Sequence, residues 1–210
     1  AAASFSAVIL DPPYSFESIS VRGRDDGAAG TSGAPTMLFH QSLVQTRRLL
    51  VNGGIAPVLC QWRRQPDVYY LMALAGLRLS ACVAWTRNRI GTGGLFRSSW
   101  DPIVVGSKGA PTLRDKSAIP NVIGVEPVRG HPHPYAKPPG LWMLFLSRIP
   151  RGGIVLDPFA GSGASAVAAI SSGHGWVGIE SDERWCEATA NGLRQFVLGM
   201  EDLPLPLVAP

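Results

Sequence analysis

The sequence predicts a single α/β domain, spanning residues 1–210, with a mostly parallel sheet covered by helices on both faces. The main observation is a repeated alternation of short apolar runs with segments of helical spacing, which is typical of parallel strands joined by helical crossovers. Hydrophobic residues make up 46% of the 210 residues and charged residues 16%, which excludes a disordered chain. The net charge of +4 is compatible with a polyanionic partner but is weak support for one.

The first expected strand ends at a rigid turn. Phe5–Leu10 is an apolar run that predicts a buried strand, and Asp11-Pro12-Pro13 ends it because proline lacks the N–H that a ladder needs. Residues 17–36 follow, rich in glycine and charge, and predict a mobile loop.

The remaining elements follow from the same periodicities. Strands are expected over 55–60, 77–85, 103–105, 153–157 and 176–180. Helices are expected over 37–50, 67–74 and 162–171, after Pro138, and after the capping residue Asp182. Asn52-Gly53-Gly54 is expected to end the first helix. Residues 106–137 have many prolines and little periodicity, which predicts an irregular surface segment.

Several classes of protein are disfavoured by simple counts. Cys60, Cys82 and Cys186 are widely spaced and form no CxxC pair, so neither a disulfide framework nor a zinc site is expected. The longest uncharged stretch, 158–179, is interrupted by glycine and serine, so no membrane span is expected. The N-terminus lacks the pattern of a secretory signal. We therefore expect a cytoplasmic protein without a metal.

The strongest local signal is a glycine turn after an apolar strand, in the run from Asp157 to Gly163. Gly161 and Gly163 allow the backbone to approach a ligand closely, and the helix that follows presents free N–H groups at its start. A second strand then ends at Glu180, where a carboxylate can accept both hydroxyls of a ribose. The alternative is a structural strand–turn–helix with an incidental acid.

The second signal is Asp11-Pro12-Pro13-Tyr14 at the end of the first strand. An acid, a rigid kink and an aromatic residue stand there at the carboxyl end of a sheet strand, where α/β sheets bind ligands. The alternative is a proline turn with a surface tyrosine.

Together these motifs resemble the S-adenosylmethionine-dependent DNA amino-methyltransferases, which methylate adenine N6 or cytosine N4. Asp11–Tyr14 matches the family's catalytic motif [DNS]-P-P-[YFW], and Asp157–Gly163 matches its cofactor motif D-P-F-x-G-S-G. The segment from His133 to Pro138 resembles H-x-x-x-K-P of the β subgroup, in which the catalytic half precedes the cofactor half. The resemblance implies a Rossmann-like methyltransferase sheet with its halves in that permuted order.

The resemblance also implies roles for the matched residues. Asp11, Pro12, Pro13 and Tyr14 would be catalytic: the Asp11 carboxylate and the Pro12 carbonyl would hold the target amine, and Tyr14 would stack on the extruded base. The cofactor S-adenosylmethionine, which leaves as S-adenosylhomocysteine, would contact a larger set. That set is Asp11, His133, Lys137, Pro138, Asp157, Phe159, Ala160, Gly161, Ser162, Gly163 and Glu180.

DNA is the partner that the resemblance implies. Arg22 and Arg24 in the 17–36 loop are candidate phosphate contacts, and residues 106–132 form a short candidate target-recognition segment with Lys108, Arg114 and Lys116. A homodimer or a separate specificity chain is a further partner left open. The β subgroup also carries a strand and an acid before its catalytic motif, and only ten residues precede Asp11 here.

The target base and the activity have alternatives. An aspartate in the first motif position favours adenine N6 and disfavours the related enzymes that methylate protein glutamine, whereas cytosine N4 is the alternative base. A non-catalytic nucleic-acid-binding subunit that retains the fold is the alternative of another class, and the intact motifs argue against it.

Overall fold

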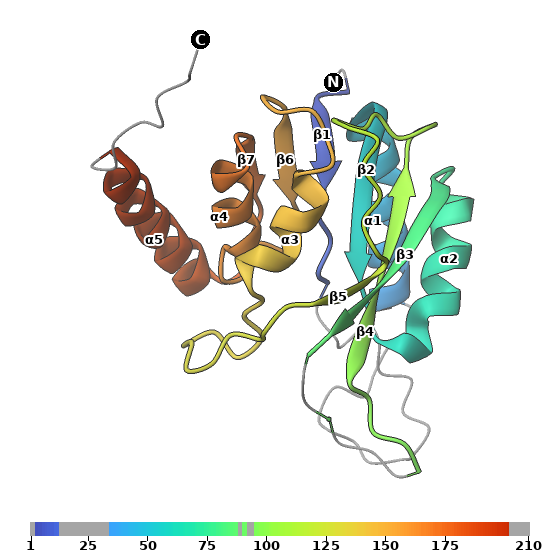
Figure 1. Ribbon diagram of the computed structural model, residues 1–210, viewed down its shortest axis with the longest axis horizontal. Coiled ribbons are helices and arrows are strands. Elements are labelled where there is room, and N and C mark those ends of the chain that lie inside the picture. Colours follow the sequence, from blue (N-terminus) through green and yellow to red (C-terminus); the bar gives the residue numbers. More distant parts are fainter. Residues whose placement is uncertain (1–2, 13–33, 88–89, 92–94, 202–210) are drawn as a thin grey trace.

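The computed structural model of the chain describes residues 3–12, 34–87, 90–91 and 95–201, and these form a seven-stranded sheet flanked by helices (Figure 1). The strands are β1 (Phe5–Val8), β2 (Leu50–Leu59), β3 (Arg78–Thr86), β4 (Trp100–Ser107), β5 (Val122–Gly124), β6 (Ile154–Asp157) and β7 (Gly175–Gly178). The helices are α1 (Ala34–Leu49), α2 (Gln65–Leu74), α3 (Pro139–Leu146), α4 (Ala164–Ser171) and α5 (Glu183–Glu201).

The sheet order is β5-β3-β4-β2-β1-β6-β7. β1 pairs in parallel with both β2 and β6, β6 pairs in parallel with β7, and β5 pairs in parallel with β3. β4 alone among these strands runs antiparallel, to β2 on one side and β3 on the other. The predicted mostly parallel sheet is therefore confirmed, and the carboxyl ends of the other six strands lie on one edge. We call this the carboxyl edge, and it includes the start of β4.

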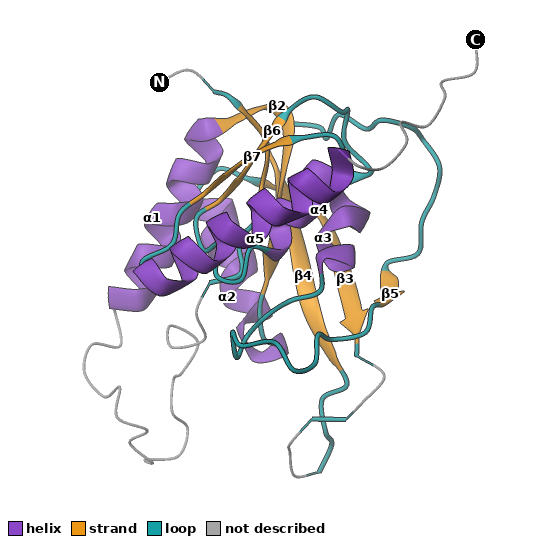
Figure 2. Cartoon of the chain, turned by 90° about the vertical axis from the view of Figure 1, so that its left-hand side faces the viewer, coloured by secondary structure: helices purple, strands orange, loops and turns teal. Residues whose placement is uncertain are grey.

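Helices cover both faces, because successive side chains along and just after β1 are all buried and pack against opposite layers. Ala7 and Ile9 pack in a cluster with the apolar side chains of α3 and α4. Val8 and Leu10 point the other way and pack with those of α1 and α2. Figure 2 shows α1 on one side of the strands and α3 and α4 on the other, with α5 crossing the front of the view. Burial on both faces is why the strands read as continuous apolar runs rather than as alternating ones.

Most elements lie where the sequence predicts them, with two corrections. Asn52-Gly53-Gly54 does not end the first helix: it lies within β2, which starts at Leu50, and Gly53 takes a φ of +81°. The Gly53 N–H donates to the Lys108 carbonyl at 2.7 Å, so the glycines serve a contact with the end of β4 rather than a helix stop. The second correction is β5, a short strand inside the segment expected to be irregular.

Candidate functional site

Three acids follow three neighbouring strands at the carboxyl edge. Asp11 follows β1, Asp157 ends β6, and Glu180 follows β7. Because β1, β6 and β7 are adjacent and parallel, their ends meet at one place, and all three acids line one cavity of about 550 Å³. The two motifs, far apart in the sequence, therefore form one site.

The glycine turn is held open by hydrogen bonds to Asp157, which is 3% exposed. One carboxylate oxygen of Asp157 accepts the Phe159 N–H at 2.9 Å, and the other accepts the Ser165 hydroxyl. Gly161 and Gly163 have φ values of +50° and +76°, in the left-handed region that favours glycine. Burial raises the pKa of Asp157 to about 7, against the lowering effect of those hydrogen bonds.

Glu180 connects the end of β7 to the same turn. Its Oε2 accepts the Gly161 N–H at 2.8 Å, and its Oε1 accepts the Asp182 N–H at 2.9 Å. The Thr189 hydroxyl on α5 donates to the Gly161 carbonyl at 2.9 Å, so the turn is held from both sides. A carboxylate oxygen can accept more than one hydrogen bond, and Glu180 therefore keeps acceptor capacity toward the cavity.

Asp11 is paired with a lysine from a distant segment. The Lys137 ammonium lies 2.8 Å from Asp11 Oδ2, and the two side chains are 11% and 18% exposed. Burial raises the pKa of Asp11, while the Lys137 charge and hydrogen bond lower it. β1 is fixed up to Asp11, because the Leu10 N–H donates to the Pro57 carbonyl at 3.0 Å and the Leu10 carbonyl accepts the Leu59 N–H at 3.0 Å.

The segment before α3 closes over the glycine turn. The His133 ring stands edge-on to Trp185 of α5 with ring centroids 4.5 Å apart. A Cβ built on Gly161 would come 3.4 Å from His133 Nε2, so the ring lies directly over the turn. Burial is the main cause of the lowered pKa of His133. A neutral ring is therefore expected above the cavity at neutral pH.

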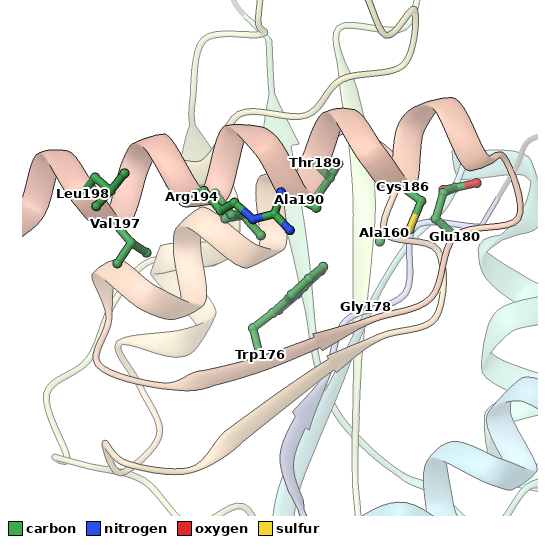
Figure 3. A pocket seen from close by; sticks show the side chains of 11 residues that line it. Ala160, Trp176, Gly178, Glu180, Cys186, Thr189, Ala190, Arg194, Val197 and Leu198 are labelled. Atoms are coloured by element: carbon green, nitrogen blue, oxygen red, sulfur yellow. The ribbon is translucent and has the colours of Figure 1, made fainter.

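A second hollow, about 560 Å³, lies between α5 and β7. Figure 3 shows Trp176 pointing from β7 toward α5, with Arg194 and Val197 reaching down from the helix. It shares Ala160 and Glu180 with the cavity of the three acids. Glu180 is the one carboxylate among its lining residues, so we assign the chemistry to the first cavity.

The structure brings together many of the residues singled out from the sequence. Those lining the first cavity are Asp11, Pro12, His133, Lys137, Asp157, Phe159, Ala160, Gly161, Ser162 and Glu180. Gly163 and Pro138 are buried beside them. Pro13, Tyr14, Arg22 and Arg24 lie outside the described residues, as does nearly all of the 17–36 loop.

The basic residues of the 106–132 segment lie elsewhere. β4 runs away from the carboxyl edge, so Lys108, just past its end, reaches the opposite edge, where its ammonium donates to the Leu50 carbonyl at 2.8 Å. The Arg114 N–H donates to the Arg148 carbonyl, which precedes β6, at that same edge. Lys116 follows two residues later. The structure does not bring these three side chains to the edge that holds Asp11.

Some cavity residues escaped the sequence reasoning. Trp142 and Ser165 line the cavity from α3 and α4, and Thr189 fixes the turn from α5. Trp142 and Ser165 are buried and read as core positions, so the sequence offered no functional signal for them. Thr189 lies four residues after Trp185, on the helix face that meets the turn, and that spacing was the available signal.

Among the described residues, no helix has the length and apolar character to cross a membrane. In the same part of the chain, no group of three or more histidine, cysteine and acidic side chains is arranged to hold a metal ion.

Comparisons with known proteins agree with the geometry. The sequence model of the DNA methylase family matches residues 111–191. The Escherichia coli K12 protein named "Putative methylase YubD" is 28% identical over 183 residues, which are 86% of this chain and 78% of that protein. The matched family region contains the glycine turn and Glu180 but not Asp11.

The solved structures that share the fold include two DNA methyltransferases. M1.HpyAVI in complex with S-adenosylmethionine superimposes with a TM-score of 0.70 at 18% identity, covering 90% of this chain and 89% of that one. The cytosine-N4-specific PvuII DNA methyltransferase superimposes with a TM-score of 0.68 at 15% identity, covering 90% and 79%. At these identities the likeness establishes the fold.

Proposed function

We propose that this chain, which belongs to the family of S-adenosylmethionine-dependent adenine-N6 and cytosine-N4 DNA methyltransferases, methylates an exocyclic amine of a base in DNA, with adenine N6 as the first choice. The observation that carries the proposal is the meeting of Asp11, the glycine turn and Glu180 around one cavity. The family match over residues 111–191 supports the proposal, and so does the position of Asp11 on the same cavity as the glycine turn.

The residues present suit the cofactor. A glycine turn at the start of α4, a buried Asp157 and an acid after the next strand fit the amino-acid and ribose portions of S-adenosylmethionine. Three carboxylates also suit a ligand that carries a sulfonium and an ammonium. When bound, S-adenosylmethionine supplies a methyl group on a positively charged sulfur: the amine nitrogen bonds to the methyl carbon, the carbon–sulfur bond breaks, and the electron pair of that bond stays on sulfur.

Asp11 and Pro12 would make the target amine nucleophilic. The lone pair of an exocyclic amine is delocalised into the ring, so the nitrogen is a poor nucleophile. Acceptance of its two hydrogens by the Asp11 carboxylate and the Pro12 carbonyl favours a pyramidal nitrogen with its lone pair directed outward. The surplus proton of the methylated nitrogen then passes to the Asp11 carboxylate and on to water.

The test is direct. Unmethylated genomic DNA is incubated with the protein and S-adenosylmethionine, digested to nucleosides and analysed by mass spectrometry. We expect N6-methyladenine; N4-methylcytosine would retain the mechanism and change the base.

Asp11→Ala should abolish transfer, because it removes one of the two acceptors of the amine. Asp115→Ala is the matched control, since that carboxylate is half exposed and pairs with Arg148. A protein that binds DNA equally well with and without Asp11 and never methylates it would instead be the non-catalytic subunit.

A further inference from the structure

The connection between β3 and β4 projects from the carboxyl edge. β3 runs in the same direction as β1, as its antiparallel pairing to β4 and that of β4 to β2 require. The chain therefore leaves β3 at Thr86 and enters β4 at Trp100 on the side of the sheet that holds Asp11. The segment leading into β4 reaches beyond the ends of the strands at the bottom of Figure 1.

The base of this connection is tied down on the catalytic side. The Arg87 N–H donates to the Ser99 carbonyl at 3.0 Å, and the Gly91 N–H donates to the Ser98 carbonyl at 2.7 Å. The Arg87 guanidinium lies 3.2 Å from the Asp101 carboxylate. Asp101 stands at the start of β4, two strands from β1, so this part of the connection lies at the same edge of the sheet as Asp11.

Beyond this tethered part of the β3–β4 connection, large apolar side chains are exposed to solvent. Leu95 is 93% exposed and Phe96 is 86% exposed, the highest values among the large hydrophobic residues that the structure describes. Ile90, on the other arm of the connection, is also exposed. A single exposed leucine is ordinary, but adjacent leucine and phenylalanine on a tethered projection form a patch of the kind that meets a partner.

We propose that Leu95 and Phe96 form a wedge that enters the base stack of duplex DNA beside the target base. The proposal rests on the proposed function and adds how the duplex is opened. An amine inside a duplex cannot reach Asp11, so the base must leave the stack. Apolar side chains inserted at the vacated step stabilise the opened duplex, as leucine and phenylalanine do in proteins that kink DNA.

The chemistry of the neighbouring residues favours nucleic acid over a protein partner. Arg97 follows directly, is exposed, and can contact a phosphate next to an inserted Phe96. Residues 95–100 contain no acid, and Asp101 is already paired with Arg87. Phe96 can stack on any base, so the wedge opens the duplex without selecting a DNA sequence. Recognition of the sequence is left to other contacts.

The test uses the double variant Leu95→Ala/Phe96→Ala. Methylated positions are first mapped in genomic DNA with the unaltered protein, which defines a short duplex probe. Two forms of the probe are then compared, one with the target base paired and one with the opposite base removed. We expect transfer to the paired probe to fall at least tenfold, and transfer to the unpaired probe to stay within twofold of the unaltered protein.

The control is Leu74→Ala, which removes a 57% exposed leucine at the end of α2. α2 leads to the start of β3, so Leu74 lies at the edge of the sheet away from Asp11. S-adenosylmethionine affinity, measured by calorimetry, should be unchanged in both variants. Equal losses on the two probes, or no loss on either, would overturn the wedge. Absence of methylation by the unaltered protein would instead refute the proposed function.

Discussion

The two aspartates of the site are held by different partners. Asp11 faces the Lys137 ammonium at 2.8 Å, with His133 on the same segment as Lys137, Asp157 on the neighbouring strand β6, and Asp101 on β4, two strands away. Within the described part of the chain, Asp157 receives hydrogen bonds from a hydroxyl and an N–H, and burial raises its pKa to about 7. The Lys137 charge lowers the pKa of Asp11 and so favours the carboxylate, against burial, which is the larger effect and raises that pKa.

Replacing Lys137 with glutamine should move the acid limb of the transfer rate to higher pH. Lys137 is the main group that lowers the pKa of Asp11, so its loss strengthens the effect of burial, and the carboxylate that the amine requires is present only at higher pH. The measurement is the rate of transfer from pH 5.5 to 8.5, with Lys116→Gln as control. If Lys137 serves only the cofactor, affinity for S-adenosylmethionine falls at every pH and the limb stays in place.

Replacing Asp157 with asparagine should remove part of the pH dependence of stability. The unfolded carboxyl ionises near 3.8 and the folded one near 7, so between these values the folded state binds the extra proton and stability falls as pH rises. Asparagine keeps the acceptor for the Phe159 N–H. Relative to the unaltered protein, Asp157→Asn should gain stability from pH 5 to pH 8 in urea unfolding; a constant difference would contradict the raised pKa.

At the residue scale, the motifs could be identified from sequence because they combine rare local requirements. Gly161 and Gly163 do adopt left-handed backbone, and Glu180 does follow the next strand. The pairing of Asp11 with Lys137 could not be derived in that way, because 126 positions separate them and only the sheet order brings them together. The sign of the charge alone does not identify which of the nineteen lysines and arginines pairs with Asp11.

At the scale of elements, the turn between β6 and α4 depends on its contact with α5. A Cβ on Gly163, where φ is +76°, would come 2.6 Å from the Thr189 methyl carbon. The same Thr189 holds the Gly161 carbonyl, so the helix and the turn fit each other closely. Strain in this turn would therefore disturb both the cavity and the packing of α5 against the turn.

Gly163→Ala should destabilise the protein by more than about 1 kcal/mol, because a left-handed alanine alone costs about that much. Gly192→Ala offers the matched control within α5, where a Cβ meets no atom within 4 Å. There the change should stabilise by about 0.5–1 kcal/mol through helix propensity. Both are measured as free energies of unfolding in urea. Equal effects at the two glycines would contradict the described turn.

Element boundaries were harder to predict than element types. Asn52-Gly53-Gly54 has the composition of a helix stop. It lies in β2 instead, because Gly53 forms backbone hydrogen bonds with Lys108 and Thr112, which follow the end of β4. β5 has only three residues, too few for any periodicity, and exists because β3 offers it a parallel edge. In both cases a tertiary contact decides what a local pattern cannot.

For the whole molecule, the alternation of strands and helices was sufficient to predict a parallel sheet, and the motif order was sufficient to place the catalytic half first. Neither the alternation nor the motif order predicts the order of the strands in the sheet, because each strand is apolar enough to pair with several others. The consequence is functional: the sheet puts β1 next to β6 and β6 next to β7, so the three acids of the site, Asp11, Asp157 and Glu180, stand at the ends of three adjacent strands.

The central place of β1 also sets a timetable for synthesis. β1 leaves the ribosome first, but its neighbour β6 begins at Ile154, about 146 residues later. At roughly 5–20 residues per second, one side of β1 stays without its partner for on the order of ten to thirty seconds. During that time Ala7 and Val8, which will pair with Val155 and Leu156, remain an open strand edge. This edge of β1 must therefore be kept from pairing with other strands until β6 has been synthesised.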